Sequence, residues 1–293
     1  MKLLKISVSG LPLFYDPCEI DFLAFQRVTS DNTDKMSPLF STKTNTFYQN
    51  NVLSFIGINA SGKTSILKLL TFICRMMDNE SINNSDYSEI LDGISEGEPV
   101  SFDIYFYTNN GAVNFLHTVV CRKNGRFIIT DEYLKSKPRA KVKSKADVFR
   151  FNDIEPAKKR DNDEAFLLDD VSIMVAYKKI CRDKLIVTDM LRYTNVNQLS
   201  ISEDCPPEWI AFFDPSIEYL HVQNVTKDTI IRLKFYGKEP ILLNKLSDLN
   251  RYLSSGTIKG INVFVKAVSV FRSGGYLIID ELENHFNHEI VST

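Results

Sequence analysis

Eight consecutive residues, Gly57–Thr64, have the types and the spacing of a loop that binds phosphate. They read G-I-N-A-S-G-K-T and fit the P-loop pattern G-x-x-x-x-G-K-[ST]. The two glycines let the backbone fold closely around an anion, which the loop amides and the positive end of a following helix stabilise. Lys63 would reach the β- and γ-phosphates of a nucleotide, and the Thr64 hydroxyl would ligate Mg²⁺. The pattern therefore predicts a site for a nucleoside triphosphate and its magnesium ion.

The elements around this loop have the order that the motif requires. Residues 52–56 form an apolar run typical of a buried strand, and residues 65–73 have the composition of a buried helix. A chance match to the fixed positions is expected in roughly one chain of this length in a hundred, and the flanking elements make it rarer. The residues expected to contact the nucleotide are Gly57, Asn59, Ala60, Ser61, Gly62, Lys63, Thr64 and Ser65.

Ser254, Ser255 and Gly256 form a second group that could bind an anion. They precede a segment with apolar residues at helical spacing, which ends at residues 273–275. Hydroxyl groups and an amide at a helix start would make a second anion-binding corner. Taken alone, the same three residues are more typical of an ordinary helix N-cap.

Asp280 and Glu281 close an apolar strand predicted over residues 276–281. A buried strand would aim Asp280 at the Mg²⁺ held by Thr64, directly or through water. Glu281 could act as general base on the water that attacks the γ-phosphate. Phosphoryl transfer depends mainly on positioning and charge neutralisation. The predicted catalytic residues are therefore Glu281 and Lys63, and the predicted metal ligands are Thr64 and Asp280.

Together, the loop, the serine-glycine corner and the strand-end carboxylates resemble the ATP-binding cassette (ABC) ATPases, whose signature L-S-G-G-Q/E precedes a helix and a strand ending in Asp-Glu. The loop itself resembles the G-x-N-x-[SA]-G-K-[ST] form of the SMC and RecF branch. Leu253–Thr257 (L-S-S-G-T) and Asp280–Glu283 (D-E-L-E) are similar to bacterial AAA-type ATP-binding proteins, which include the OLD-family and abortive-infection ATPases.

The resemblance implies an α/β P-loop NTPase with a mixed parallel core sheet and an additional antiparallel sheet. Its ATPase parts would be residues 1–130 and 225–293, and residues 131–224 would be an insertion of unknown fold. Two copies of the chain would sandwich two ATP molecules with Mg²⁺, and Ser255 and Gly256 of one copy would cap the γ-phosphate held by Lys63 of the other. Hydrolysis would open this dimer, so that ATP acts as a switch.

By the same resemblance, such a switch would serve a bacterial anti-phage or abortive-infection system and would control an effector protein, a nuclease or a toxin. Two alternatives remain. One is a RecF- or SMC-like DNA-binding ATPase in DNA repair, and the other is a slow ATP switch that sequesters a toxin or nuclease. The signature carries Ser255 and Thr257 where a second Gly and a Gln are commoner, which argues against a transporter subunit.

Some positions of the ABC pattern are less well defined. His285 and His288 could line the dimer interface or lie on a solvated helix face, and Gln198 and Gln223 are candidates for the lid (Q-loop) glutamine. The strand and switch histidine of ABC ATPases would follow Thr293, so the sequence is expected to be the front part of a longer protein.

Composition excludes several classes of protein. The chain has 293 residues, a formal net charge of −2 and hydrophobic and charged fractions of 44% and 25%, all typical of a soluble globular protein. Five cysteines without a C-x-x-C pair favour a reduced compartment. No signal peptide and no membrane-spanning apolar run is visible. We therefore expect a cytoplasmic protein with no membrane contact.

Basic residues occupy every second position from 135 to 145: Lys135, Lys137, Arg139, Lys141, Lys143 and Lys145. In an extended segment they would project to one side and could follow a nucleic acid backbone. The favoured alternative is a solvated loop, because an acidic stretch at residues 161–170 follows closely and could neutralise the charge.

Overall fold

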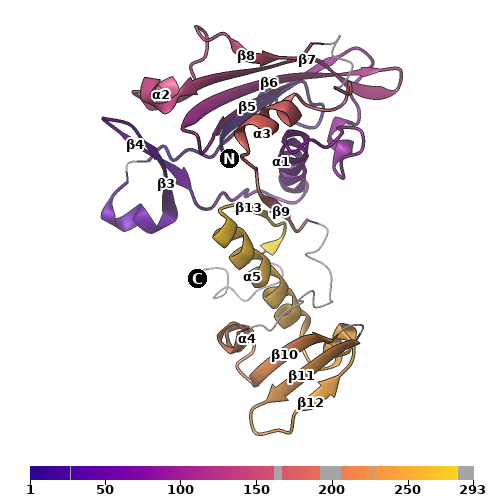
Figure 1. Ribbon diagram of the computed structural model, residues 1–293. Helices are drawn as coiled ribbons and strands as arrows, with labels where there is room; N and C mark the ends of the chain where they lie inside the picture. Colours follow the sequence, from indigo (N-terminus) through magenta and orange to yellow (C-terminus); the bar gives the residue numbers. More distant parts are fainter. Residues whose placement is uncertain (27, 162–166, 192–205, 226–227, 283–293) are drawn as a thin grey trace. The chain divides into compact units, whose positions relative to one another are not determined.

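The computed structural model of the chain describes residues 1–26, 28–161, 167–191, 206–225 and 228–282 (Figure 1). The chain forms two compact units, Met1–Leu185 and Ile186–Thr293. The boundary between the units lies inside the predicted insertion, residues 131–224, which therefore contributes residues to both of them.

A six-stranded sheet is the frame of the first unit. Its strands lie in the order β2-β1-β5-β6-β7-β8, and each neighbouring pair is antiparallel. The pattern of alternating residues predicts a hairpin around residues 109–111, and the pairing of β5 with β6 confirms it. The strands are β1 (Lys2–Ser9), β2 (Cys18–Asp21), β5 (Pro99–Tyr107), β6 (Ala112–Lys123), β7 (Arg126–Pro138) and β8 (Pro156–Lys159).

Helices cover the apolar face of this sheet. Because side chains alternate between the faces of a strand, four residues of β5 point to this face and are completely buried: Val100, Phe102, Ile104 and Phe106. Helix α1 (Lys63–Met77) contributes Phe72, whose ring centroid lies 6.0 Å from that of Phe102. Helix α3 (Met174–Cys181) contributes Tyr177, 6.1 Å from Phe106. The short helix η2 (Ser88–Leu91) buries Ile90 and Leu91. The sheet therefore fixes the helix that follows the phosphate-binding loop.

An aromatic cluster occupies part of the opposite face. Tyr105 and Phe115 stack with ring centroids 4.7 Å apart, and Phe149 meets Tyr105 edge-on at 5.2 Å. Phe149 belongs to a covering segment, residues 139–154, that includes η3 (Arg139–Lys141) and α2 (Lys145–Val148). Beside it, η1 (Ser30–Lys35) precedes a hairpin of β3 (Met36–Ser41) and β4 (Thr46–Asn50), and Phe40 of β3 stacks on Tyr107 at 4.8 Å.

The basic stripe of residues 135–145 does not form one exposed row. Strand β7 ends at Pro138 and the chain turns into η3, so the alternation of an extended strand stops there. Lys137 is buried, and its Nζ donates to the carbonyls of Asp147 and Arg150 and lies 3.9 Å from the Phe151 ring centroid. Three stripe residues donate to backbone carbonyls in this way: Lys135, Lys137 and Lys145. An ammonium has three donors, so these lysines fasten the covering segment to its surroundings.

A buried ion pair joins Glu132 of β7 to Arg160, and hydrogen bonds join the same carboxylate to residues 172 and 173. The side chains of Glu132 and Arg160 are 0% and 4% exposed, and Oε2 and Nη2 lie 3.5 Å apart. The Glu132 carboxylate also accepts hydrogen bonds from Thr118 Oγ1 (3.0 Å), Ser172 Oγ (2.5 Å) and the Ile173 amide (2.8 Å). Burial raises the pKa of Glu132, and these hydrogen bonds and the charge of Arg160 oppose that rise.

Replacing Arg160 should therefore destabilise the protein. Arg160→Met leaves the Glu132 carboxylate without its cation, and we expect the free energy of unfolding at pH 7 to fall by about 3 kcal/mol. The loss should shrink as the pH falls towards the raised pKa of Glu132, because a protonated carboxyl no longer needs a counter-ion. Urea unfolding followed by far-UV circular dichroism measures this. The double variant Arg160→Met/Glu132→Gln should recover part of the loss, and no recovery would contradict the electrostatic explanation.

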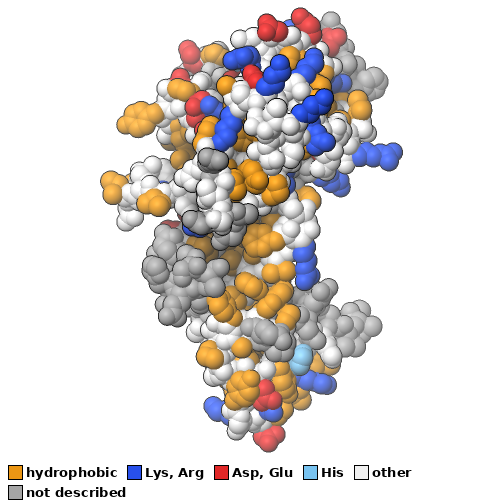
Figure 2. All heavy atoms as spheres, turned by 90° about the vertical axis from the view of Figure 1, so that its left-hand side faces the viewer, with side chains coloured by type: hydrophobic (Ala, Val, Ile, Leu, Met, Phe, Trp, Pro, Cys, Tyr) orange, Lys and Arg blue, Asp and Glu red, His pale blue; other side chains and the backbone are white. Residues whose placement is uncertain are grey.

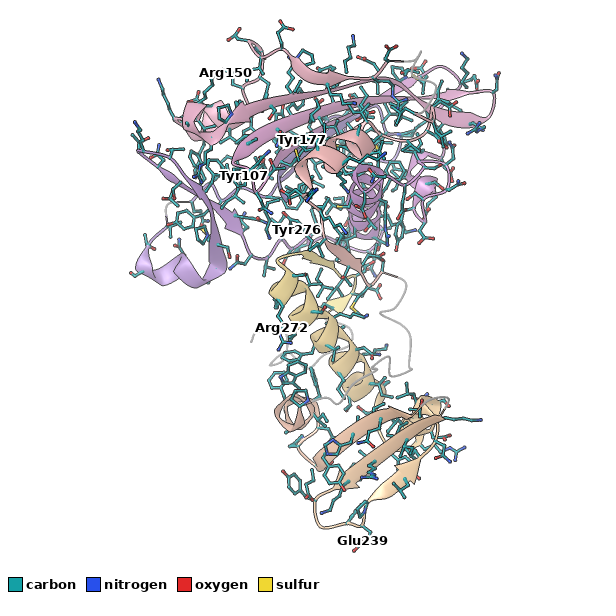
Figure 3. All side chains as sticks on the ribbon, viewed as in Figure 1. Tyr107, Arg150, Tyr177, Glu239, Arg272 and Tyr276 are labelled. Carbon is teal, nitrogen blue, oxygen red and sulfur yellow. The ribbon has the colours of Figure 1, made fainter. Side chains whose placement is uncertain are left out.

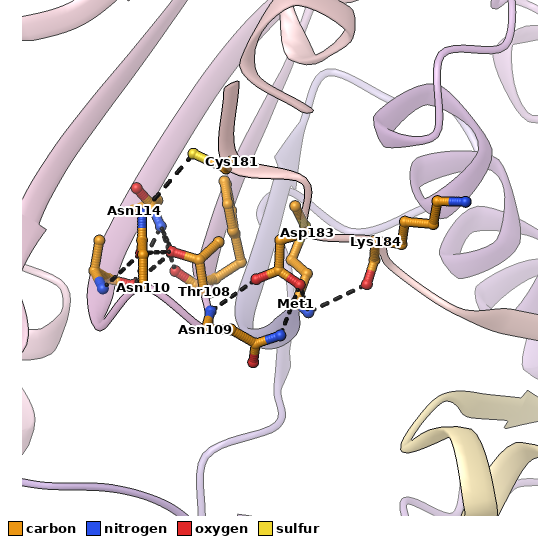
Figure 4. Close-up of polar contacts among 10 residues, drawn as sticks. Met1, Thr108, Asn109, Asn110, Asn114, Cys181, Asp183 and Lys184 are labelled. Atoms are coloured by element: carbon orange, nitrogen blue, oxygen red, sulfur yellow. Dashed lines mark hydrogen bonds and ion pairs between the residues drawn. The ribbon is translucent and has the colours of Figure 1, made fainter. Parts of the chain in front are cut away.

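Polar contacts fasten the end of the first unit to its hairpin turn (Figure 4). The carboxylate of Asp183 accepts hydrogen bonds from the amide of Asn109 and the nitrogen of Met1, both at 2.7 Å. Within the turn, Thr108 Oγ1 accepts from Asn114 Nδ2 at 3.0 Å and donates to Asn110 Oδ1 at 2.8 Å. The two bonds of Asp183 therefore hold the end of the first unit against both the N-terminus and the hairpin turn.

The second unit has its own hydrophobic core. Its three-stranded antiparallel sheet has the order β10-β11-β12 and packs with three helices around buried residues such as Leu220, Leu233 and Ile258. A separate parallel pair joins β9 to β13. The elements are β9 (Val187–Asp189), α4 (Pro207–Phe213), β10 (Ile217–Val225), β11 (Asp228–Phe235), β12 (Ile241–Leu243), η4 (Leu246–Arg251), α5 (Ser255–Ser273) and β13 (Tyr276–Ile278).

The observed sheets differ in part from the predicted mixed parallel core. The first unit contains an antiparallel sheet throughout, and β9–β13 is the one parallel strand pair in the described part of the chain. The predicted strand at residues 52–56 is not assigned as a strand. A strand needs neighbours to pair with its backbone, and this segment belongs to none of the sheets formed by the described residues.

Candidate functional site

The geometry of the phosphate-binding loop favours glycine at both of its glycine positions. Gly62 is the N-cap of α1 and has φ +87°, a left-handed conformation that glycine adopts without strain. A Cβ atom on Gly62 would meet no atom within 4 Å, so its backbone faces open space. A Cβ on Gly57 would lie 2.3 Å from Ser61 Oγ and 3.1 Å from Ser61 Cβ, so a larger residue there would require the Ser61 side chain to rotate and the loop to shift slightly. The loop is thus a tight turn whose outer side is open.

The start of α1 is arranged to attract an anion. The glycine N-cap has no side chain to accept hydrogen bonds from the amides of the first turn, and that turn carries no acidic residue. Lys63 is the first helical residue, and its Nζ curls back to donate to the carbonyls of Gly57 (2.8 Å) and Ile58 (3.0 Å). An ammonium and the positive helix end therefore lie on the same short loop.

The other residues predicted to contact the nucleotide lie in the loop and in the first turn of α1. Asn59, Ala60, Ser61 and Thr64 are exposed, and Ser65 is half-buried in the first turn of α1. Ala60 has φ +63°, an uncommon conformation for a residue other than glycine. The predicted helix over residues 65–73 is confirmed and extends from Lys63 to Met77.

The segment before the loop is apolar but exposed. Val52 and Ile56 are 77% and 94% exposed, where the sequence predicts a buried strand. In the part of the chain that the structure describes, no strand pairs with this segment. An apolar segment of this kind is stabilised by neighbouring strands that cover both its faces and its backbone.

Ser254 is the N-cap of α5. Its Oγ accepts a hydrogen bond from the Thr257 amide at 3.0 Å, so this side chain has the ordinary capping role. Thr257, which was not among the predicted site residues, is buried, and its Oγ1 lies 2.8 Å from Ser254 Oγ. An N-cap serine accepts from the amide two or three residues further along, so Ser254 is the sequence signal that could have pointed to residue 257. Ser255 is exposed and Gly256 half-buried, in the first turn of the helix.

Close packing sets the position of α5 against α4. A Cβ atom on Gly260 would lie 2.4 Å from Cδ1 of the Phe213 ring, so the helices approach where Gly260 has no side chain. We expect Gly260→Ala to lower the stability of the second unit by about 1–3 kcal/mol, because an added methyl overpacks this contact. The single tryptophan of the chain, Trp209, lies in α4. Its fluorescence during urea unfolding therefore reports on this unit.

A second variant controls for the helix propensity of alanine in the Gly260 test. Phe213→Leu removes the ring edge, so Gly260→Ala should cost less stability in the Phe213→Leu background than in the wild type. An equal cost in both backgrounds would contradict the steric explanation.

The two carboxylates follow β13 closely. β13 ends at Ile278, earlier than the predicted end at residue 281, and Asp280 and Glu281 lie just beyond it. The Glu281 amide donates to Asp280 Oδ1 at 3.0 Å. Glu281 has φ +52°, a left-handed conformation that is uncommon outside glycine. The turn therefore leaves the Glu281 side chain exposed and Asp280 half-buried.

The predicted site residues are shared between the two units. The first unit brings together residues 57–65, and the second contains the α5 start and the strand-end carboxylates. Gln223 is exposed on β10. His285, His288 and Gln198 lie outside the described residues.

A phosphate-binding loop that opens a helix, and a strand followed by two carboxylates, define the class of P-loop nucleotide-binding proteins. Residues 52–171, the loop and most of the antiparallel sheet, match the family described as "AAA domain, putative AbiEii toxin, Type IV TA system". The match supports a P-loop ATPase of the abortive-infection class. No curated protein and no solved structure matches the chain. None of the described helices is long and apolar enough to span a membrane.

Proposed function

We propose that this chain is an ATP-binding and ATP-hydrolysing ABC-type module that works as a nucleotide-gated dimer in a bacterial abortive-infection system. The observation that carries the proposal is the loop of residues 57–64. Gly62 caps the helix in a left-handed conformation with open space beside it, Lys63 Nζ lies against the loop, and the first turn of the helix carries no acidic residue. The family match covers this same loop.

The residues present fit a nucleoside triphosphate with magnesium. The loop amides and Lys63 would hold the β- and γ-phosphates, which are anionic. Thr64 and Asp280 offer hydroxyl and carboxylate oxygen, the donors that Mg²⁺ prefers, and phosphates and water would complete its coordination. The ion would neutralise charge on the phosphates. This proposal requires residues from both units to act on the same nucleotide.

In the proposed reaction Glu281 is the general base. Its carboxylate would take a proton from the attacking water, and Lys63 would stabilise the charge that develops on the phosphate oxygens. The exposed side chain of Glu281 at the end of β13 is compatible with this role. No covalent intermediate with the protein is needed.

Dimer formation would complete the site. Ser255 and the Gly256 amide of one copy would cap the γ-phosphate held by Lys63 of the other copy. The location of Ser255 and Gly256 in the first turn of α5, where the helix dipole favours an anion, supports this arrangement. Opening of the dimer after hydrolysis would then signal to an effector, a nuclease or a toxin.

The direct test combines ATP turnover with molar mass. We expect the wild-type chain to hydrolyse ATP only with Mg²⁺, and light scattering to show a dimer that forms with Mg-ATP and dissociates as ADP accumulates. Binding of ATP without any change in mass would contradict the gated dimer but not the nucleotide site. Absence of ATP binding in calorimetry would contradict both.

A further inference from the structure

The strongest positive charge of the chain is concentrated in residues 135–160. This segment holds ten basic and three acidic residues, a net charge of +7, in a chain whose total is −2. Side chains of Lys and Arg gather on the face of the molecule that carries α2 (Figure 2). Such a local concentration matters because the overall charge would repel a polyanion, so any attraction must come from this surface.

The structure separates nine of the ten basic residues of this segment into two groups, and the tenth, Lys158, is half-buried. Lys135, Lys137 and Lys145 donate to backbone carbonyls, and Arg160 pairs with buried Glu132. A second group is exposed, and we name it the basic surface: Arg139, Lys141, Lys143, Arg150 and Lys159. In the described residues, four of these five side chains form no ion pair. Arg150 forms one, in which Nη1 lies 3.4 Å from Asp147 Oδ1. The cations of the basic surface are therefore available to an external anion.

The backbone that carries the basic surface is held in place. Arg139 donates its amide to the Gly111 carbonyl at 2.9 Å, and the Lys143 carbonyl accepts from Asn45 Nδ2 at 2.7 Å. Val142, just before α2, and Val148, the last residue of α2, are buried in the core of the first unit. Arg150 lies two residues after the end of α2 (Figure 3). A fixed backbone reduces the entropy that is lost when the cations bind a ligand.

Two carboxylates of the acidic stretch that follows, Asp169 and Asp170, do not neutralise this surface. Asp170 is buried and accepts hydrogen bonds from Ser81 and Asn83. Although burial acts to raise the pKa of Asp170, those hydrogen bonds and the charge of Arg126 keep it below its usual range. Asp169 also lies near Arg126, at 3.8 Å. These two carboxylates are therefore engaged with other partners.

We propose that the basic surface binds the phosphodiester backbone of a nucleic acid without reading its sequence. A backbone of phosphates is bound mainly by Lys and Arg through release of counter-ions. A protein partner would instead need an apolar or aromatic anchor at the centre of its interface. None of the exposed large hydrophobic side chains in the described residues falls within residues 135–160. The surface thus has the cations for phosphates and lacks the anchor for a protein.

Fluorescence anisotropy without nucleotide tests this proposal independently of ATP binding. The probes are fluorescein-labelled 30-mers, as single-stranded and duplex DNA and the same in RNA, titrated with the full chain from 25 to 200 mM NaCl. The test variant is Lys141→Glu/Lys143→Glu/Arg150→Glu. The matched control, Lys238→Glu/Lys245→Glu/Arg251→Glu, reverses three exposed basic residues of the second unit. Circular dichroism verifies that both variants fold.

We expect the wild type and the control to bind with similar affinity. The test variant should bind at least ten times more weakly, and the slope of log K against log salt should fall in magnitude by about three, one for each lost phosphate contact. The DNA and RNA arms identify the natural backbone. Equal weakening by the control, competition by poly-L-glutamate as strong as by unlabelled DNA, or no binding by the wild type at 25 mM NaCl would each overturn the proposal.

Discussion

Lys63→Ala should weaken Mg-ATP binding by about 100-fold. The ammonium would make charge-assisted hydrogen bonds to two phosphates, and their loss is worth about 3 kcal/mol, or about two powers of ten in the dissociation constant. The fold should tolerate the change, because the partners of Nζ within the chain are two carbonyls of the exposed loop. Isothermal titration calorimetry with Mg-ATP measures the affinity, and circular dichroism verifies the fold.

Lys68→Ala is the matched control for this experiment. Lys68 lies on the same helix, five residues further along, and its Nζ is 3.2 Å from Glu89 Oε1 at the surface. A surface ion pair contributes about 1 kcal/mol or less to stability, and Lys68 is not on the phosphate-binding loop. We therefore expect wild-type ATP affinity for Lys68→Ala. If Lys63→Ala also binds ATP like the wild type, the loop is not the nucleotide site.

Glu281→Gln should separate ATP binding from ATP hydrolysis. Removing a general base typically lowers kcat by a factor of about 10² to 10⁴, whereas the phosphate-binding loop and its affinity for ATP should be unchanged. The substitution keeps the size of the side chain, so the left-handed turn at residue 281 should remain. Because the bound ATP is not consumed, the dimer should persist in Mg-ATP, which light scattering detects as a stable doubled mass.

Glu239→Gln is a suitable control for the loss of one carboxylate from the second unit. Glu239 is exposed in the turn between β11 and β12 (Figure 3), and we expect wild-type turnover and wild-type mass changes for this variant. Turnover of Glu281→Gln at the wild-type rate would exclude Glu281 as the base. Slow turnover without a persistent dimer would support the catalytic role and contradict the nucleotide gate.

The two proposed activities should be separable by mutation. The proposed ATP site would use residues 57–64 of the first unit and carboxylates of the second, whereas the basic surface lies entirely in the first unit. Lys63→Ala should therefore leave nucleic acid binding in the absence of nucleotide unchanged, and the basic-surface variant should still bind Mg-ATP. Weaker nucleic acid binding by Lys63→Ala, or weaker Mg-ATP binding by the basic-surface variant, would indicate that the two sites are coupled.

Features that depend on neighbours in the chain were predictable from the sequence. The phosphate-binding loop, the helix after it and the capped helix after Ser254 depend on φ angles, caps and apolar spacing over a few residues. The hairpin at residues 109–111 follows from alternation around an Asn-Asn-Gly turn in the same way. In each case the residues that determine the element are close together in the sequence, so the pattern contains the information.

Features that depend on distant partners required the folded chain. The basic stripe has a regular alternation, but Lys137 turns inward because residues 147–151 offer carbonyls and an aromatic ring beside it. The apolar run at residues 52–56 has the composition of a buried strand, yet burial requires neighbouring strands, which local composition does not specify. The engagement of Asp170 with Ser81 and Asn83 likewise joins residues far apart in sequence. Packing and hydrogen-bond partners over such separations, rather than local pattern, determine which charges face solvent.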